Sequence, residues 1–65
     1  MPTISVTVPK DAWTKDQKAS IARTLTDGLA DVAQSAGKGD IKQYINVHIE
    51  ETSDGGYAIG GNVVG

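Results

Sequence analysis

The sequence predicts an α+β fold, in which a β-α-β unit with parallel strands is followed by a short C-terminal β-hairpin. Three observations predict it. Residues 3–8 and 44–50 each alternate apolar and polar side chains, as strands with one apolar face do. Between them, apolar residues spaced by threes and fours extend from a capping signal at Thr14 to about Ala36. Two glycine pairs stand at turn positions within residues 53–64, which favours a hairpin.

The first strand places Ile4, Val6 and Val8 on one face and ends at Pro9. After the loop of residues 10–13 comes the helix. Thr14 can cap the helix and Gln17 can return the bond, which together form a capping box. The expected apolar stripe consists of Ile21, Ala22, Leu25, Leu29, Val32, Ala33 and Ala36, and the residues expected to face water are Lys18, Asp27, Asp31 and Gln34. Gly37 and Gly39 form a plausible stop.

The second strand is expected from Tyr44 to Glu50, with Ile45, Val47 and Ile49 alternating against polar neighbours. Because a strand, a crossover helix and a second strand form a βαβ unit, the two strands should be parallel. The helix should cover the face that carries their isoleucine and valine side chains.

A chain of 65 residues forms one domain, residues 1–65, and buries only about 60% of its unfolded surface. No cysteine is available for a disulfide. A two-stranded sheet is marginal by itself, and its second face would carry only polar side chains. We therefore expect an oligomer in which sheets join edge to edge or face to face and the C-terminal hairpins reach neighbouring chains.

Composition excludes several functions. The net charge is −2 and the six basic residues are scattered, which argues against a nucleic-acid partner. No apolar stretch approaches the ~20 residues of a membrane span, and no secretory leader opens the chain, so we expect no membrane partner and a cytoplasmic location. With no cysteine and a single histidine, neither a metal nor another cofactor is expected.

Pro2 is the best candidate catalyst. Removal of Met1 would expose a secondary amine at the start of a rigid strand, and an α-amino group titrates near ~8, lower in an apolar pocket. Retention of Met1 would make the same nitrogen an amide without basicity. The alternative is purely structural, because proline is tolerated at the first position of a strand.

The chain resembles the 4-oxalocrotonate tautomerase family over essentially its whole length. The resemblance rests on Met1-Pro2-Thr3-Ile4, on Thr14-Lys15-Asp16-Gln17-Lys18, and on Ile45-Asn46-Val47-His48-Ile49 followed by Glu51 and by Tyr57-Ala58-Ile59-Gly60-Gly61. It implies a tautomerase-like β-α-β fold assembled as a hexamer, a trimer of dimers. It also implies that the terminal proline moves a proton between carbons of a small enol or dienol acid.

Two departures from the family bear on the substrate. The best-known members carry one arginine in the loop before the helix and another on the second strand, where this chain has Trp13 and Asn46. Neither residue can bind a carboxylate through two charged hydrogen bonds, so a dicarboxylate substrate is disfavoured. A monocarboxylate, an uncharged enol or an aldehyde fits better. Either one of Lys10, Lys15 and Arg23 replaces the arginines, or each is a solvated charge.

The other candidate site residues also have two interpretations each. Asn46 either donates to a substrate carbonyl or fills a polar face between subunits. His48 either titrates in the site or is a hydrogen-bonded interface residue. Trp13 either covers the pocket or anchors a subunit contact. Tyr57 falls where the family has a pocket aromatic, or it packs the hairpin. Glu50 and Glu51 are expected to be strand-end charges for solubility or for an interface.

Three functions follow. The first is a tautomerase with Pro2 as general base and Asn46, Tyr57, Trp13 and His48 shaping the site. The second is a hydratase or dehalogenase of unsaturated acids. The third is a non-catalytic subunit of the same fold, alone or paired with an active partner chain.

Overall fold

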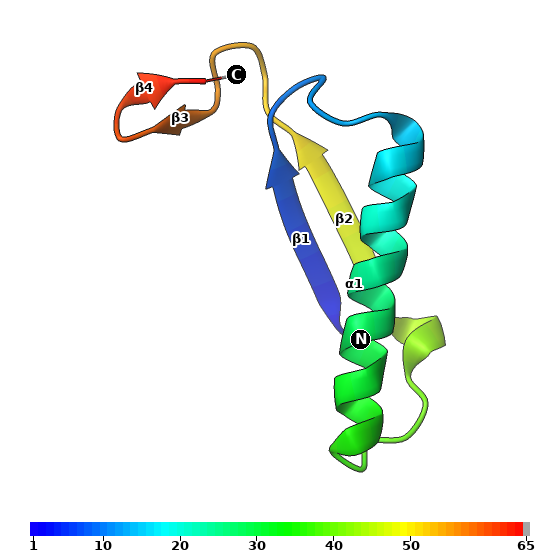
Figure 1. Ribbon diagram of the computed structural model, residues 1–65. Coiled ribbons are helices and arrows are strands. Elements are labelled where there is room, and N and C mark those ends of the chain that lie inside the picture. Colours follow the sequence, from blue (N-terminus) through cyan, green and yellow to red (C-terminus); the bar gives the residue numbers. More distant parts are fainter. Residues whose placement is uncertain (65) are drawn as a thin grey trace.

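The computed structural model describes residues 1–64. Strand β1 (Thr3–Val8) leads into the long helix α1 (Lys15–Ser35), which is followed by the short 3₁₀ helix η1 (Lys42–Tyr44) and strand β2 (Asn46–Glu51). The two-residue strands β3 (Ala58–Ile59) and β4 (Asn62–Val63) come last. Figure 1 shows β1 and β2 side by side, with α1 lying along one face of this small sheet.

The predicted β-α-β unit is confirmed. Strands β1 and β2 are parallel, with Thr3 opposite Asn46 and Val8 opposite Glu51. Exposure alternates along both strands, and the more buried side chains are those of the isoleucines and valines. The apolar face of the sheet is therefore the face that α1 covers.

The expected start of the second strand was wrong. Residues 42–44 form η1, and β2 begins only at Asn46. Asp40 Oδ1 accepts a hydrogen bond from Lys42 N, while Tyr44 N donates to the carbonyl of Ile41. These local bonds close a turn before the chain can pair with β1, so period-two alternation at Tyr44 does not produce a strand.

Both ends of α1 match their sequence signals. Thr14 Oγ1 accepts from Gln17 N at 3.1 Å, and Gln17 Oε1 accepts from Thr14 N at 2.8 Å, so the capping box is complete. At the other end, Gly37 has φ +78° and Lys38 N donates to Ala33 O at 2.9 Å. This is a Schellman-type stop, which requires a residue in the left-handed region and favours glycine.

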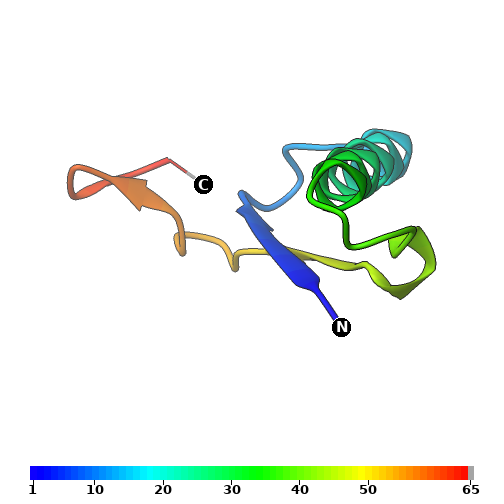
Figure 2. The same ribbon diagram turned by 90° about the horizontal axis from the view of Figure 1, so that it is seen from below.

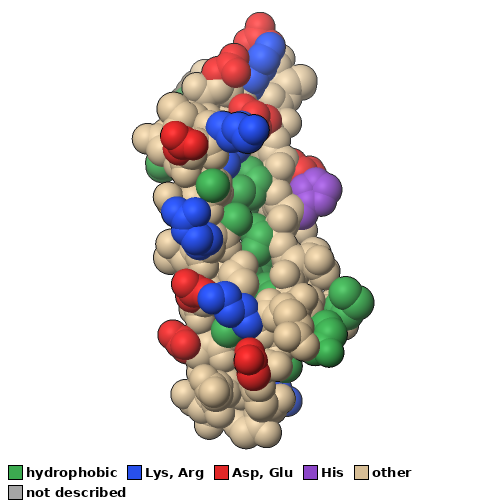
Figure 3. Space-filling model, turned by 90° about the vertical axis from the view of Figure 1, so that its right-hand side faces the viewer, with side chains coloured by type: hydrophobic (Ala, Val, Ile, Leu, Met, Phe, Trp, Pro, Cys, Tyr) green, Lys and Arg blue, Asp and Glu red, His purple; other side chains and the backbone are tan. Residues whose placement is uncertain are grey.

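The predicted stripe on α1 is confirmed for most of its members and wrong at Val32, which is 65% exposed. Ala36, at the C-cap, is exposed too. Lys18 was expected to face water, but its ammonium forms an ion pair with Glu51 on β2. The space-filling view in Figure 3 shows charged side chains over the helix surface and hydrophobic ones filling the seam between helix and sheet.

The predicted C-terminal hairpin is confirmed as β3 paired antiparallel with β4. Gly60 and Gly61 have φ +57° and +84°. A two-residue type I′ hairpin turn requires positive φ at both of its central residues. Figures 1 and 2 both show the hairpin projecting away from α1, at the end of the molecule where β1 finishes. Its exposed apolar side chains belong to Ile59, Val63 and Val64.

The described chain has little interior of its own. Only Val8 and Ala33 are buried hydrophobic residues, at 8% and 4% exposure. The radius of gyration is 14.6 Å, against about 11 Å for a compact domain of this length. The molecule measures 43 × 25 × 16 Å, so it is flat and elongated, and the β3–β4 hairpin projects from it. Such a chain has the form of a subunit, and this is the physical basis for the oligomer proposed below.

Candidate functional site

Pro2 and Asn46 meet where the two parallel strands begin. Asn46 N donates to the carbonyl of Pro2 at 2.9 Å, and the strand register continues from this bond. Pro2 is half-buried, whereas Met1 is 88% exposed. The peptide bond between them therefore lies at the accessible end of a fixed strand, and its cleavage would leave an amine of defined position.

Tyr44 also reaches this end of the sheet, and sequence reasoning did not include it in the site. It is 49% exposed, and its carbonyl accepts a 3.4 Å hydrogen bond from Asn46 Nδ2. A signal was present in the sequence. Because β1 and β2 are parallel, the residues that lead into β2 must lie beside the start of β1.

His48 shares the open face of the sheet with Asn46 but lies farther along β2, opposite Ser5. Its Nε2 is 3.3 Å from Glu50 Oε1, and both side chains are about 60% exposed (62% and 60%). His48 is thus engaged with Glu50 within one chain, and nothing in the geometry directs it toward Pro2. A role for it in the site stays a prediction.

Trp13 and Tyr57 lie at the opposite end of the sheet from Pro2. Trp13 is 44% exposed in the loop between β1 and α1, and Tyr57 precedes β3. Figure 1 shows this loop and the hairpin beyond the carboxyl ends of both strands, whereas the N-terminus is at the amino ends. The six residues of β1 span roughly 20 Å. One chain alone therefore does not bring either aromatic residue to Pro2.

The loop that carries Trp13 is fixed by Glu51, at the end of β2. Glu51 Oε1 lies 2.6 Å from Lys18 Nζ, and Oε2 accepts from Asp11 N at 2.8 Å. The hydrogen bond from Lys18, followed by that from the Asp11 amide, holds the pKa of the Glu51 carboxyl below its ordinary 4.5. Glu51 therefore joins the end of β2 to the start of α1 and to the turn at Asp11, a role that the sequence analysis did not include. Its expected role as a solubility or interface charge stays a prediction.

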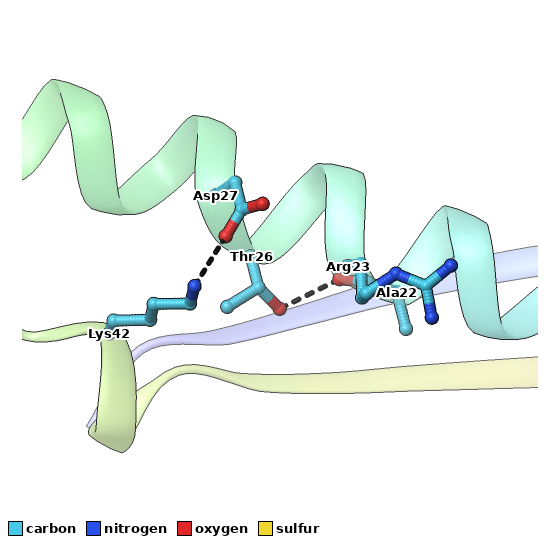
Figure 4. Close-up of a pocket in the computed structure, with 5 residues that line it drawn as sticks. All are labelled: Ala22, Arg23, Thr26, Asp27 and Lys42. Atoms are coloured by element: carbon cyan, nitrogen blue, oxygen red, sulfur yellow. Dashed lines mark hydrogen bonds and ion pairs between the residues drawn. The ribbon is translucent and has the colours of Figure 1, made fainter.

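A hollow of about 210 Å³ lies elsewhere, between α1 and η1, and is lined by Ala22, Arg23, Thr26, Asp27 and Lys42. Figure 4 shows Lys42 of η1 directed at Asp27, and their charged atoms are 2.9 Å apart. This hydrogen bond raises the pKa of Lys42 above its ordinary 10.5. Arg23, one of the cations considered as a replacement for the missing arginines, lines this hollow, whereas Pro2, Trp13, Asn46, His48 and Tyr57 do not. The ion pair between Lys42 and Asp27 joins η1 to α1.

The fold is that of a small β-α-β protein in which Pro2 directly precedes the first strand. The family model described as tautomerase enzyme matches residues 2–65, and the chain belongs to this family. Comparison with curated proteins and with solved structures gave no significant match. Within residues 1–64, no helix is both long and apolar enough to cross a membrane. Membership of the family suggests an activity of the tautomerase or isomerase type.

Proposed function

We propose that this chain is a tautomerase in which the Pro2 nitrogen, free after removal of Met1, is the general base for keto-enol proton transfer on a small carbonyl compound or enol acid. The observation that carries the proposal is the position of Pro2. It directly precedes β1, is held to β2 by the bond from Asn46, and opens the segment that matches the family.

In this mechanism the neutral amine takes a proton from the enol oxygen or from the carbon next to the carbonyl, and the resulting ammonium returns a proton at the other position. The Asn46 amide, with the hydroxyl of the neighbouring Tyr44 as a second donor, has the role of stabilising developing negative charge on the substrate oxygen. A positioned base of this kind contributes about 10² to 10⁴ in rate.

The amine must be neutral at working pH, and desolvation lowers the pKa of a cationic acid toward that state. Pro2 is only half-buried in one chain. We therefore also propose a homo-oligomer, with the hexamer that the family resemblance implies as its form. The small core, the extended shape and the exposed apolar hairpin support an assembly. They do not fix the number of chains.

The test uses purified protein whose intact mass shows that Met1 has been removed. We expect it to ketonise phenylenolpyruvate, with the enol absorbance as the readout, and we expect Pro2→Ala to lower kcat by at least about 10². Thr3→Ala, one residue further along β1, is the matched control and should retain activity. Equal turnover by Pro2→Ala and the parent protein would refute Pro2 as the base, and no turnover by the parent protein would assign the chain to the non-catalytic alternative. Formation of a hydrated or dehalogenated product from an unsaturated acid, without ketonisation, would assign it to the second.

A further inference from the structure

The chain contains two Asp-Gly sequences, at residues 27–28 and 54–55, and the structure places them in opposite surroundings. An aspartyl carboxyl group can react with the amide nitrogen of the next residue. Glycine favours this reaction because it has no side chain to hinder the approach of that nitrogen. The remaining aspartates each precede a residue with a side chain, namely Ala12, Gln17, Val32 or Ile41. Conformation therefore decides which of the two Asp-Gly sequences reacts.

Asp54 and Gly55 are the central residues of a turn between β2 and β3. Gly56 N donates to the carbonyl of Ser53 at 2.8 Å, Gly55 has φ +77°, and Asp54 has a negative φ. This is the pattern of a type II turn, which favours glycine at its third position. All four residues of the turn are exposed. Figure 1 shows the segment that contains them as an arch outside both the sheet and the helix.

The amide nitrogen of Gly55 is accessible to the Asp54 carboxyl group. The bond that closes the turn is donated by Gly56, and within residues 1–64 the Gly55 N–H makes no hydrogen bond. No atom lies within 4 Å of the place where a Cβ of Gly55 would stand. Ring closure requires rotation of the Asp54 main chain, which only the one turn hydrogen bond opposes. Opening of such an exposed turn costs little free energy.

The sequence Asp27–Gly28 lies inside α1 and is held on several sides. As an interior helical residue, Gly28 donates its N–H to the carbonyl four residues earlier. Asp27 Oδ1 lies 2.9 Å from Lys42 Nζ, so the carboxylate is drawn toward η1. Rotation of the Asp27 main chain would break helical hydrogen bonds together with this ion pair. The helix therefore protects this sequence from the reaction.

We propose that Asp54 is a site of spontaneous modification, at which the peptide bond to Gly55 rearranges through a succinimide to isoaspartate. The Gly55 nitrogen forms a bond to Asp54 Cγ, the Cγ–OH bond breaks, and the hydroxyl leaves as water with the amide proton. Water then adds to one of the two ring carbonyls. Cleavage between nitrogen and Cγ restores aspartate, whereas cleavage between nitrogen and the main-chain carbonyl carbon of Asp54 leaves isoaspartate of unchanged mass.

The modification changes the connection between the sheet and the C-terminal hairpin. In isoaspartate the main chain runs through Cβ and Cγ, so it becomes one carbon atom longer. The turn lies between the bond from Thr52 N to Val8 O, at 3.0 Å, and the bond from Val64 N to Tyr57 O, at 2.8 Å. The first belongs to the sheet and the second to the base of the hairpin. The added carbon therefore shifts the hairpin relative to the sheet.

The test follows both Asp-Gly sequences in the same sample. The folded protein is kept for several weeks in a mildly acidic buffer at physiological temperature and is then cleaved with trypsin, which separates residues 24–38 from residues 43–65. Co-elution with synthetic peptides that contain isoaspartate at position 27 or 54 identifies each product. We expect isoaspartate at position 54, and conversion at position 27 at least about tenfold slower. In concentrated urea the two positions should convert at similar rates.

Absence of isoaspartate at position 54 in the folded protein would overturn the proposal, even if it forms in urea, because the turn would then be protected. Equal conversion at positions 27 and 54 in the folded protein would overturn it too. Asp54→Glu keeps the charge but requires a larger, less favourable ring, so it should abolish the product in residues 43–65. The matched control Asp27→Glu should leave conversion at position 54 unchanged. None of these measurements depends on the proposed tautomerase activity.

Discussion

Lys18, one turn into α1, forms an ion pair with Glu51 at the last position of β2, with 2.6 Å between Nζ and Oε1. The second carboxylate oxygen of Glu51 accepts the Asp11 amide of the turn that joins β1 to α1. One side chain thus connects the strand end, the helix start and the turn. The turn at Asp11 is thereby held against the end of β2.

Glu51→Gln should lower the thermal unfolding midpoint, because the amide keeps the size of the side chain but loses the charge that attracts Lys18. Glu50→Gln is the matched control, since Glu50 is adjacent on β2 and its carboxylate lies beside the exposed His48. Both variants should be compared with the parent at one protein concentration, because unfolding of an oligomer depends on it. A larger loss in Glu50→Gln than in Glu51→Gln would contradict the connection described here.

The stabilising effect of Glu51 should depend on pH. Its pKa is lowered in the folded chain by the Lys18 hydrogen bond first and the Asp11 amide second, so the unfolded chain binds the proton more readily. The contribution of ionised Glu51 to the free energy of unfolding is therefore fully present above its ordinary pKa of 4.5 and is lost as pH falls through its folded pKa. Urea unfolding from about pH 7 to about pH 2.5 should show the gap between parent and Glu51→Gln closing. A gap independent of pH would mean that charge is not involved.

Two glycines should respond to alanine in opposite ways. A Cβ at Gly56 would lie 2.9 Å from both the carbonyl oxygen and the hydroxyl of Ser53, within a turn closed by a 2.8 Å bond between their backbones. Gly56→Ala should cost about 1–3 kcal/mol in the free energy of unfolding. At Gly28, inside α1, nothing lies within 4 Å, and Gly28→Ala should add up to about 1 kcal/mol. Urea unfolding measures both, and destabilisation by Gly28→Ala would contradict the open space beside this position.

The elements that sequence predicted best are those specified by short-range chemistry. The capping box of Thr14 and Gln17 needs only four consecutive residues, and the hairpin turn needs only Gly60 and Gly61. The start of β2 was misplaced because local hydrogen bonds near Tyr44 competed with strand pairing. The alternation of apolar and polar residues carries no information about whether local turn hydrogen bonds or strand pairing is the more stable.

The candidate site was predicted less completely, because some of the chosen residues lie at the opposite end of the sheet from Pro2. The proximity of Pro2 and Asn46 follows from parallel strands, and the same reasoning would have included Tyr44. By contrast, Trp13 and Tyr57 were chosen by resemblance, and in one chain they lie at the other end of the strands. Glu51 was missed as a structural residue because its partners, Lys18 and Asp11, are more than thirty positions away.

The most direct test of the central claim uses two chemically synthesised chains, residues 2–65 and residues 1–65, refolded in the same way. They differ by the single methionine that converts the Pro2 nitrogen from an amine to an amide. Circular dichroism and native mass establish that both fold and assemble alike. We predict that the 2–65 chain ketonises phenylenolpyruvate and that the 1–65 chain is slower by at least about 10² in kcat. Equal rates, or no turnover by the 2–65 chain, would contradict the assignment of Pro2 as the base.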